Sequence, residues 1–297
     1  MAPSSPTSEP AVASLRFPTS GGVELVADAW GDDGDPVVLL AHGGGQTRHS
    51  WGGTAAVLAR HGWYAISLDL RGHGQSGWSH DGDYRFGRFA EDVAEVADRL
   101  DRPAMVGASL GGLTGLLIEG RTAGTFRSLV LVDISPRMEP DGVDRILAFM
   151  EETMEQGFAT LEEAADVVAA YNPHRPRTND ARGLAKNLRR GEDGRWRWHW
   201  DPAFLTGMGE DPGSSIESEF HRAARTLSLP TLLVRGRMSD LVSDETAREF
   251  LADAPHAEYI DVSDAGHMVA GDRNDAFTSS VVEFLDRHRS DHPGSGS

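Results

Sequence analysis

The sequence predicts an α/β fold in which one largely parallel sheet is covered by helices on both faces. Short apolar runs recur along the chain with helical patterns between them, which is typical of βαβ units. Several runs, such as VVLLA and LVLV, are apolar throughout, as expected for strands buried on both faces. The predicted strands are Val23 to Ala29, Val37 to Ala41, Ala65 to Leu70, Ala104 to Val106, Leu129 to Ile134, Thr231 to Arg235 and Tyr259 to Val262.

The flanking patterns refine this fold. The run from Val23 to Ala29 alternates more than the others, so we expect it to be an antiparallel edge strand. Two apolar stripes with helical spacing predict helices, one through Phe89 and Val93 and one through Phe277 and Val281.

The alternation of strands and helices stops between Pro136 and about Thr226. That stretch has helical patterns and an aromatic run, but no strand like those on either side. We therefore predict a helical cap at residues 136–226, inserted into a core of residues 15–135 and 227–288. Residues 1–14 and 289–297 are rich in small and turn-forming residues and are expected to be disordered tails.

The composition argues against nucleic acids and membranes as partners. The 297 residues carry a net charge of −18, from 46 acidic and 28 basic residues, which repels polyanions. No apolar run approaches the ~20 residues of a membrane span, and the first fifteen residues lack the basic start and apolar stretch of a signal peptide. We expect a cytoplasmic protein.

The sequence also excludes several kinds of site. There is no cysteine, which rules out disulfides, Cys-ligated zinc and a thiol nucleophile. There is no Gly-Lys-Ser/Thr phosphate loop, no dinucleotide fingerprint after the first strands and no His-Glu-x-x-His zinc motif. The glycine-rich segment 72–77 has no lysine and no helical pattern after it, so we interpret it as a structural turn. We expect neither a metal nor an organic cofactor.

Ser109 is the candidate nucleophile. It lies in Gly107-Ala108-Ser109-Leu110-Gly111, between a short apolar run and an apolar helical pattern. A sharp turn of this kind from strand to helix projects a serine hydroxyl clear of its neighbours and toward a base. The small residues around Ser109 suit so crowded a turn.

A base and an acid follow in the chain. His267 lies between the last predicted strand and the last predicted helix, where a side chain can reach the ligand-binding edge of a parallel sheet. Asp240 follows a strand and precedes His267, so we expect it to orient the imidazole and stabilise the imidazolium. Asp133, at the end of LVLVD, is the alternative acid. Asp264 is too near His267 along the chain to pair with it easily and is expected to be a turn residue.

Glycines after an early strand predict an oxyanion hole. Gly43, Gly44 and Gly45 let the backbone approach a ligand without obstruction by side chains. We expect the N–H groups of Gly44 and Leu110 to stabilise a developing oxyanion, with Gly43 and Gly45 beside the substrate.

Three tryptophans mark the predicted cap. Trp196, Trp198 and Trp200 alternate with polar residues, and such alternation in an extended segment places them on one face. They either line an apolar substrate pocket or pack the cap onto the core.

With these motifs in order, the chain resembles the α/β-hydrolase superfamily from about Leu15 to Arg287. The motifs are HGGGQTRHSW, DLRGHGQS, GASLGG, GRMSDLV and DAGHM. The chain is most similar to the branch of haloperoxidases, epoxide hydrolases and carbon–carbon-bond hydrolases, whose members carry a helical lid after the sixth strand. The resemblance implies a mostly parallel eight-stranded sheet flanked by helices, with the cap inserted after strand 6. Epoxide hydrolases and haloalkane dehalogenases use an aspartate nucleophile, so Ser109 argues against both.

The triad and the resemblance imply hydrolysis of an apolar carboxylic ester or lactone through an acyl-enzyme. Three alternatives stay open. The first is a carbon–carbon-bond hydrolase of a vinylogous diketone, the second a cofactor-free haloperoxidase or perhydrolase, and the third a catalytically silent receptor for a hydrophobic ligand. The sequence leaves the natural substrate and the oligomeric state undetermined.

Overall fold

A computed structural model describes residues 12–171, 181–209, 215–262 and 275–289. Its main sheet has eight strands in the order β1-β2-β4-β3-β5-β6-β9-β10. The strands are β1 (Val12–Pro18), β2 (Glu24–Trp30), β3 (Val37–Ala41), β4 (Tyr64–Leu68), β5 (Ala104–Ala108), β6 (Leu129–Val132), β9 (Thr231–Gly236) and β10 (Glu258–Val262). β2 pairs antiparallel with β1 and β4, and the remaining pairs are parallel. The predicted mostly parallel, eight-stranded sheet is confirmed.

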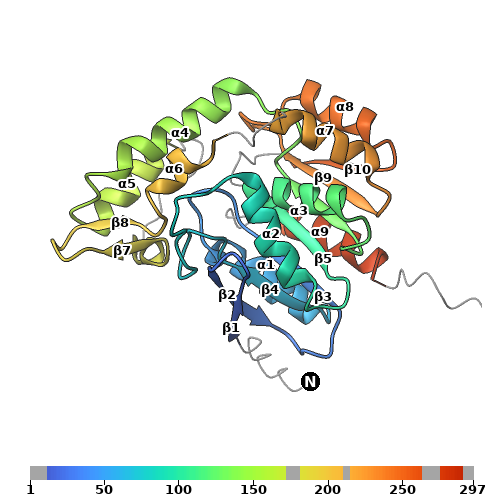
Figure 1. Cartoon of the computed structure of the whole chain (residues 1–297), viewed down its shortest axis with the longest axis horizontal. Helices are drawn as coiled ribbons and strands as arrows, with labels where there is room; N and C mark the ends of the chain where they lie inside the picture. Colours follow the sequence, from blue (N-terminus) through green and yellow to red (C-terminus); the bar gives the residue numbers. More distant parts are fainter. Residues whose placement is uncertain (1–11, 172–180, 210–214, 263–274, 290–297) are drawn as a thin grey trace, which may run out of the picture.

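Helices cover both faces of this sheet (Figure 1). One face packs against α1 (Gly52–Arg60), which follows the short helix η1 (Arg48–Trp51), and against α9 (Asp275–Arg287). The other face packs against α2 (Phe86–Ala97), α3 (Leu110–Arg121), α7 (Ile216–Thr226) and α8 (Asp244–Asp253).

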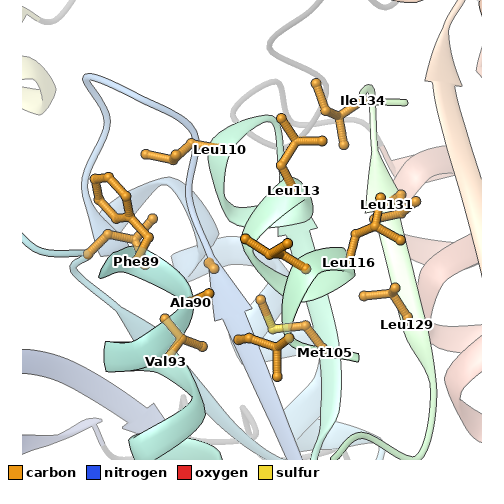
Figure 2. Packing of buried hydrophobic residues seen from close by; sticks show 14 of the residues in the cluster. Phe89, Ala90, Val93, Met105, Leu110, Leu113, Leu116, Leu129, Leu131 and Ile134 are labelled. Carbon is orange, nitrogen blue, oxygen red and sulfur yellow. The ribbon is translucent and has the colours of Figure 1, made fainter. Parts of the chain in front are cut away.

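The strand sequences explain why both faces are apolar. Neighbouring residues of a strand point to opposite faces, so a strand that is apolar throughout feeds two cores. In β5, Met105 belongs to the core under α3 and Val106 to the core under α1 and α9. Figure 2 shows Met105 and Leu129 of the sheet packed beneath Leu113 and Leu116 of α3. The helix through Phe89 and Val93 and the helix through Phe277 and Val281 are confirmed as α2 and α9.

Two details at the N-terminal side differ from the prediction. The run from Val23 to Ala29 does form an antiparallel strand, β2, but it is an interior strand, because β1 pairs along its outer side. Val12 to Ser14, which we predicted to belong to the N-terminal tail, are part of β1. The signal for β1 is weak because, among its described side chains, only Leu15 and Phe17 pack against the core, and both are partly exposed.

The insertion between β6 and β9 contains the predicted helices and a small hairpin. Its elements are α4 (Pro140–Met154), α5 (Leu161–Tyr171), η2 (Ala181–Lys186), β7 (Leu188–Arg190), β8 (Trp196–Trp198), α6 (Ala203–Gly207) and α7. β7 and β8 pair antiparallel as a separate sheet. Figure 1 shows α4 to α6 and the hairpin as a lobe beside the main sheet, whereas α7 lies over the sheet with α8. No helix in the described ranges has the length and apolar character needed to cross a membrane.

The lobe is tied to the core through the turn at residues 72–77. The Gly72 N–H donates to the Gly77 carbonyl (2.9 Å), which confirms the predicted structural turn. The Gly74 N–H donates to the carbonyl of His199 (2.7 Å), and the Asp201 N–H donates to that of Gly72 (2.7 Å). The hydroxyl of Tyr84 donates to the buried carboxylate of Asp201 (2.5 Å). The return path of the insertion is thereby fixed above the carboxyl ends of the strands.

The contact between α3 and α7 gives a test of the packing. A β-carbon on Gly120 of α3 would lie 2.3 Å from that of Ala223 in α7, so Gly120→Ala forces the helices apart. We expect a loss of about 1–3 kcal/mol in the free energy of unfolding. In the matched control Gly53→Ala, in α1, the new methyl group meets nothing within 4 Å. We expect the control to gain up to about 1 kcal/mol from helix propensity. Urea unfolding of both variants measures the difference; equal gains in the two would contradict the close approach.

Candidate active site

Ser109 occupies a strained turn between β5 and α3. Its backbone has φ 46° and ψ −116°, a conformation that non-glycine residues rarely adopt. The turn is tight because β-carbons on its glycines would collide with backbone: at 2.4 Å from Gly111 for Gly107, and at 2.4 Å from the Ala41 carbonyl oxygen for Gly111. This geometry is the predicted sharp turn from strand to helix, and it places Ser109 at the N-terminus of α3.

The predicted glycine loop lies against this serine at Gly43. A β-carbon on Gly43 would be 3.3 Å from that of Ser109, and one on Gly44 would be 3.3 Å from the Phe204 ring. Within the described part of the chain, the N–H groups of Gly44 and Leu110 have no protein acceptor. These two donors are therefore available to a ligand oxygen beside Ser109.

Two buried histidines hold the glycine loop in place. His42 accepts a hydrogen bond at Nε2 from the Leu70 N–H (3.0 Å), and its Nδ1 donates to the Gly43 carbonyl (2.7 Å). His73 accepts at Nε2 from the Gly45 N–H (3.1 Å), and its Nδ1 donates to the Arg71 carbonyl (2.8 Å). Both rings are neutral in this arrangement, because each Nε2 must accept from an N–H group.

Burial keeps these rings neutral. Burial lowers the pKa of His42 to about 4, and burial followed by the neighbouring His42 lowers the pKa of His73 to about 3. His42 is thus a scaffold residue, and His73 has the same role from the turn at residues 72–77.

The two candidate acids have different surroundings. Asp133 is fully buried and directly follows Val132, which pairs with Ala108, so it lies next to Ser109 at the same edge of the sheet. Its carboxylate accepts from the Gly236 N–H (3.0 Å) and from the Ser239 hydroxyl (2.6 Å). Its own backbone has a positive φ of 50°.

Asp240 lies in the turn after β9, and its side chain is 45% exposed. Its carboxylate forms an ion pair with Arg145 of α4, and Arg145 also donates to the Tyr171 carbonyl (2.8 Å). The carboxylate thus links the core to the inserted lobe. His267, the candidate base, and Asp264 lie outside the described residues.

Ser109 lines a cavity of about 530 Å³ between the core and the lobe. Most of its wall is apolar, and α4 contributes Ile146, Phe149 and Met150. The sequence indicates a helix there but does not reveal that its apolar face covers the nucleophile. Gly43, Gly44, Gly45 and Leu110 also belong to the wall. Among the described residues, no group of three or more His, Asp or Glu side chains is arranged to hold a metal ion.

Trp198 and Trp200 fit both interpretations, since they line the cavity and also pack in the hydrophobic clusters, whereas Trp196 fits only the packing interpretation. Trp198 and Trp200 line the cavity, and the Trp198 indole donates to the Thr153 hydroxyl (2.8 Å). Trp196 is outside the described cavity wall and packs with Phe158 and Leu188 inside the lobe. The hairpin ends at Trp198, so the alternation is not continued regularly to Trp200.

The histidine pair predicts how stability depends on pH. Both folded-state pKa values lie below the ordinary value of 6.5, so the unfolded chain binds more protons in acid. The stabilisation is complete above about pH 6.5 and is lost progressively as the pH falls toward 4 and 3. Each ring contributes a slope of up to about 1.4 kcal/mol per pH unit.

Urea unfolding of the wild type, His73→Asn and the exposed-site control His80→Asn, each between pH 4.5 and 7.5, tests this dependence. We expect His73→Asn to be less stable at pH 7.5 and to have a flatter profile, and the control to follow the wild type. Parallel profiles for all three would refute the role of His73.

Comparisons with known proteins agree with this geometry. Residues 36–273 match the family model described as the alpha/beta hydrolase fold. The chain is 31% identical over 265 residues to Esterase Rv0045c of Mycobacterium tuberculosis, covering 86% of this chain and 85% of that protein. A crystallographic structure of that esterase aligns with a TM-score of 0.77 over 94% of this chain and 93% of its own.

A second relative has a related activity. The chain is 30% identical over 251 residues to the 3-hydroxybutyrate-oligomer hydrolase of Cupriavidus necator, covering 80% of this chain and 85% of that protein. These relatives support a hydrolase of the esterase type. Since the family model spans most of the chain and the sheet order, elbow and glycine loop agree with it, the chain belongs to the α/β-hydrolase fold family.

Proposed function

We propose that this protein is a serine esterase that cleaves a carboxylic ester or lactone of a largely apolar small molecule through an acyl-enzyme. The observation that carries the proposal is the position of Ser109. It lies on a strained elbow, against the glycine loop, and on the wall of an apolar cavity.

The proposed reaction has two halves. His267 takes the proton of the Ser109 hydroxyl as the oxygen attacks the carbonyl carbon, and returns it to the leaving alcohol as the ester bond breaks. In the second half, His267 takes a proton from water as the water attacks the acyl carbon. It returns the proton to the Ser109 oxygen as the bond between that oxygen and the acyl carbon breaks and the acid leaves. The free N–H groups of Gly44 and Leu110 stabilise the oxyanion in both halves.

For the acid we favour Asp133 over Asp240. Asp133 is buried beside Ser109, and two donors hold its carboxylate in one orientation, as the partner of a catalytic imidazole requires. The carboxylate of Asp240 is half exposed and engaged by Arg145. The burial of Asp133 beside Ser109 therefore supports Asp133 as the acid, and substitution of each aspartate decides between the two.

The esterase relatives favour ester cleavage over the carbon–carbon, peroxidase and receptor alternatives. Relatives with lower identity include a chloroperoxidase (27%) and a dienoic acid hydrolase (26%), so these reactions are the ones to assay in parallel.

The nucleophile and the acid are tested by substitution. Ser109→Ala is expected to abolish hydrolysis of p-nitrophenyl esters and labelling by a fluorophosphonate, with an unchanged circular dichroism spectrum. Asp133→Asn is expected to lower kcat by about 10⁴, because the imidazole is no longer held in the correct tautomer.

Asp240→Asn is the matched control and is expected to lower kcat by less than about tenfold, because it breaks only a partly exposed ion pair. A larger loss for Asp240→Asn than for Asp133→Asn would return the acid to Asp240. Full activity of Ser109→Ala would exclude the serine mechanism.

The cavity wall is tested with two neighbouring tryptophans. Truncation of Trp198, which lines the cavity, is expected to lower kcat/KM for a bulky aryl ester by about ten- to a hundredfold and for an acetate hardly at all. Trp196→Ala, inside the lobe, is expected to lower the melting temperature and to affect both esters equally. The same equal loss in Trp198→Ala would show that Trp198 only packs the lobe.

A further inference from the structure

The chain has a single lysine, Lys186, and it lines the same cavity as Ser109. Every other residue among the 28 lysines and arginines is an arginine. Lys186 ends the short helix η2 in the inserted lobe. The positive charge of this ammonium, on the wall of a largely apolar cavity, must be balanced either by a protein group or by a ligand.

The fold provides this ammonium with no counter-charge in the described part of the chain. The described cavity wall contains neither aspartate nor glutamate, although the chain has 46 acidic residues. No described carboxylate pairs with Lys186. Two arginines of the same lobe do have such a partner: Arg145 pairs with Asp240, and Arg197 pairs with Asp193.

The cavity wall also contains polar residues, among them Asn187 and His49. The neighbouring Asn187 carboxamide accepts from the Thr47 hydroxyl (2.7 Å), which ties this end of the lobe to the residues just after the glycine loop. Burial and the charge of Arg48 lower the pKa of His49, and the charge of Lys186 adds to this effect. His49 and Lys186 both line the cavity. Lys186 is itself exposed, which places it where the cavity meets solvent.

We infer that Lys186 binds a carboxylate at the end of the substrate remote from the scissile ester, so that the preferred substrates are esters whose apolar chain ends in an acid. This inference rests on the proposed esterase function. The apolar wall accommodates the chain, and Lys186 at the rim holds the charged end without removing it from water. One ammonium balances one negative charge, which fits a carboxylate better than a phosphate dianion.

Matched esters test this inference. p-Nitrophenyl hydrogen glutarate and p-nitrophenyl valerate have acyl chains of equal length, with and without a terminal carboxylate. 4-Acetoxybutyrate and butyl acetate make the same comparison on the alcohol side. We expect Lys186→Met to lower kcat/KM for the acid-ended ester of one pair by about 3- to 10-fold, mainly through KM, and to leave the neutral esters unchanged.

Further variants separate local recognition from general charge. Lys186→Arg is expected to retain most of the preference and Lys186→Glu to reverse it. Arg190→Met is the control. Arg190 lies in β7 of the same lobe, is exposed and is not part of the described cavity wall. We expect this control to match the wild type. Added salt is expected to lower kcat/KM for the acid-ended ester in the wild type and in Arg190→Met, but not in Lys186→Met.

Two results would overturn the inference. In the first, Lys186→Met has the wild-type kcat/KM for both the acid-ended and the neutral ester of each pair. In the second, Arg190→Met lowers kcat/KM for the acid-ended esters as much as Lys186→Met does. Hydrolysis of the neutral esters would leave the proposed esterase function intact in either case. Failure of the wild type to hydrolyse any of the four esters would instead refute the proposed function.

Discussion

The close approach of α3 to β3 is the constraint on which the candidate site depends. Gly111 lies so near the Ala41 carbonyl that a β-carbon would come within 2.4 Å of it, and its N–H donates to the His42 carbonyl (3.2 Å). At the start of this helix Ser109 has a positive φ. The strained nucleophile and the glycine loop are therefore linked through one contact, since His42 precedes Gly43 directly.

A loop made of glycines has no side chains of its own to hold it, so its stability comes from beneath. His42 and His73 supply buried ring nitrogens that satisfy backbone groups of the loop and its neighbours. Neutral imidazoles suit this role because each offers one donor and one acceptor. His73 belongs to the turn at residues 72–77, which also holds the inserted lobe through Gly74. The turn at residues 72–77 thus positions both the glycine loop and the lobe that lines the cavity.

Features encoded by local patterns could be predicted from the sequence. The inner strands and the elbow at Ser109 are such features, because burial on both faces and a crowded turn restrict the residue types. β1 was not predicted, because its inward side chains, Leu15 and Phe17, are only partly buried. The ion pair that engages the Asp240 carboxylate could not be predicted either, because its partner Arg145 is distant in sequence and belongs to the lobe. Which tryptophans line the cavity likewise depends on where the hairpin ends.

The division of labour between core and lobe follows from how each is built. The core holds Ser109, Gly44 and Leu110 on elements that pack tightly around buried strands, so their geometry tolerates little change. The lobe contributes the facing wall, in part from short elements such as η2 and β8, where Lys186 is exposed and Trp198 is half-buried. Substitutions there alter the shape and charge of the cavity without disturbing the elbow. Differences in substrate among proteins with this core are therefore expected to arise in the lobe, where Lys186 lies.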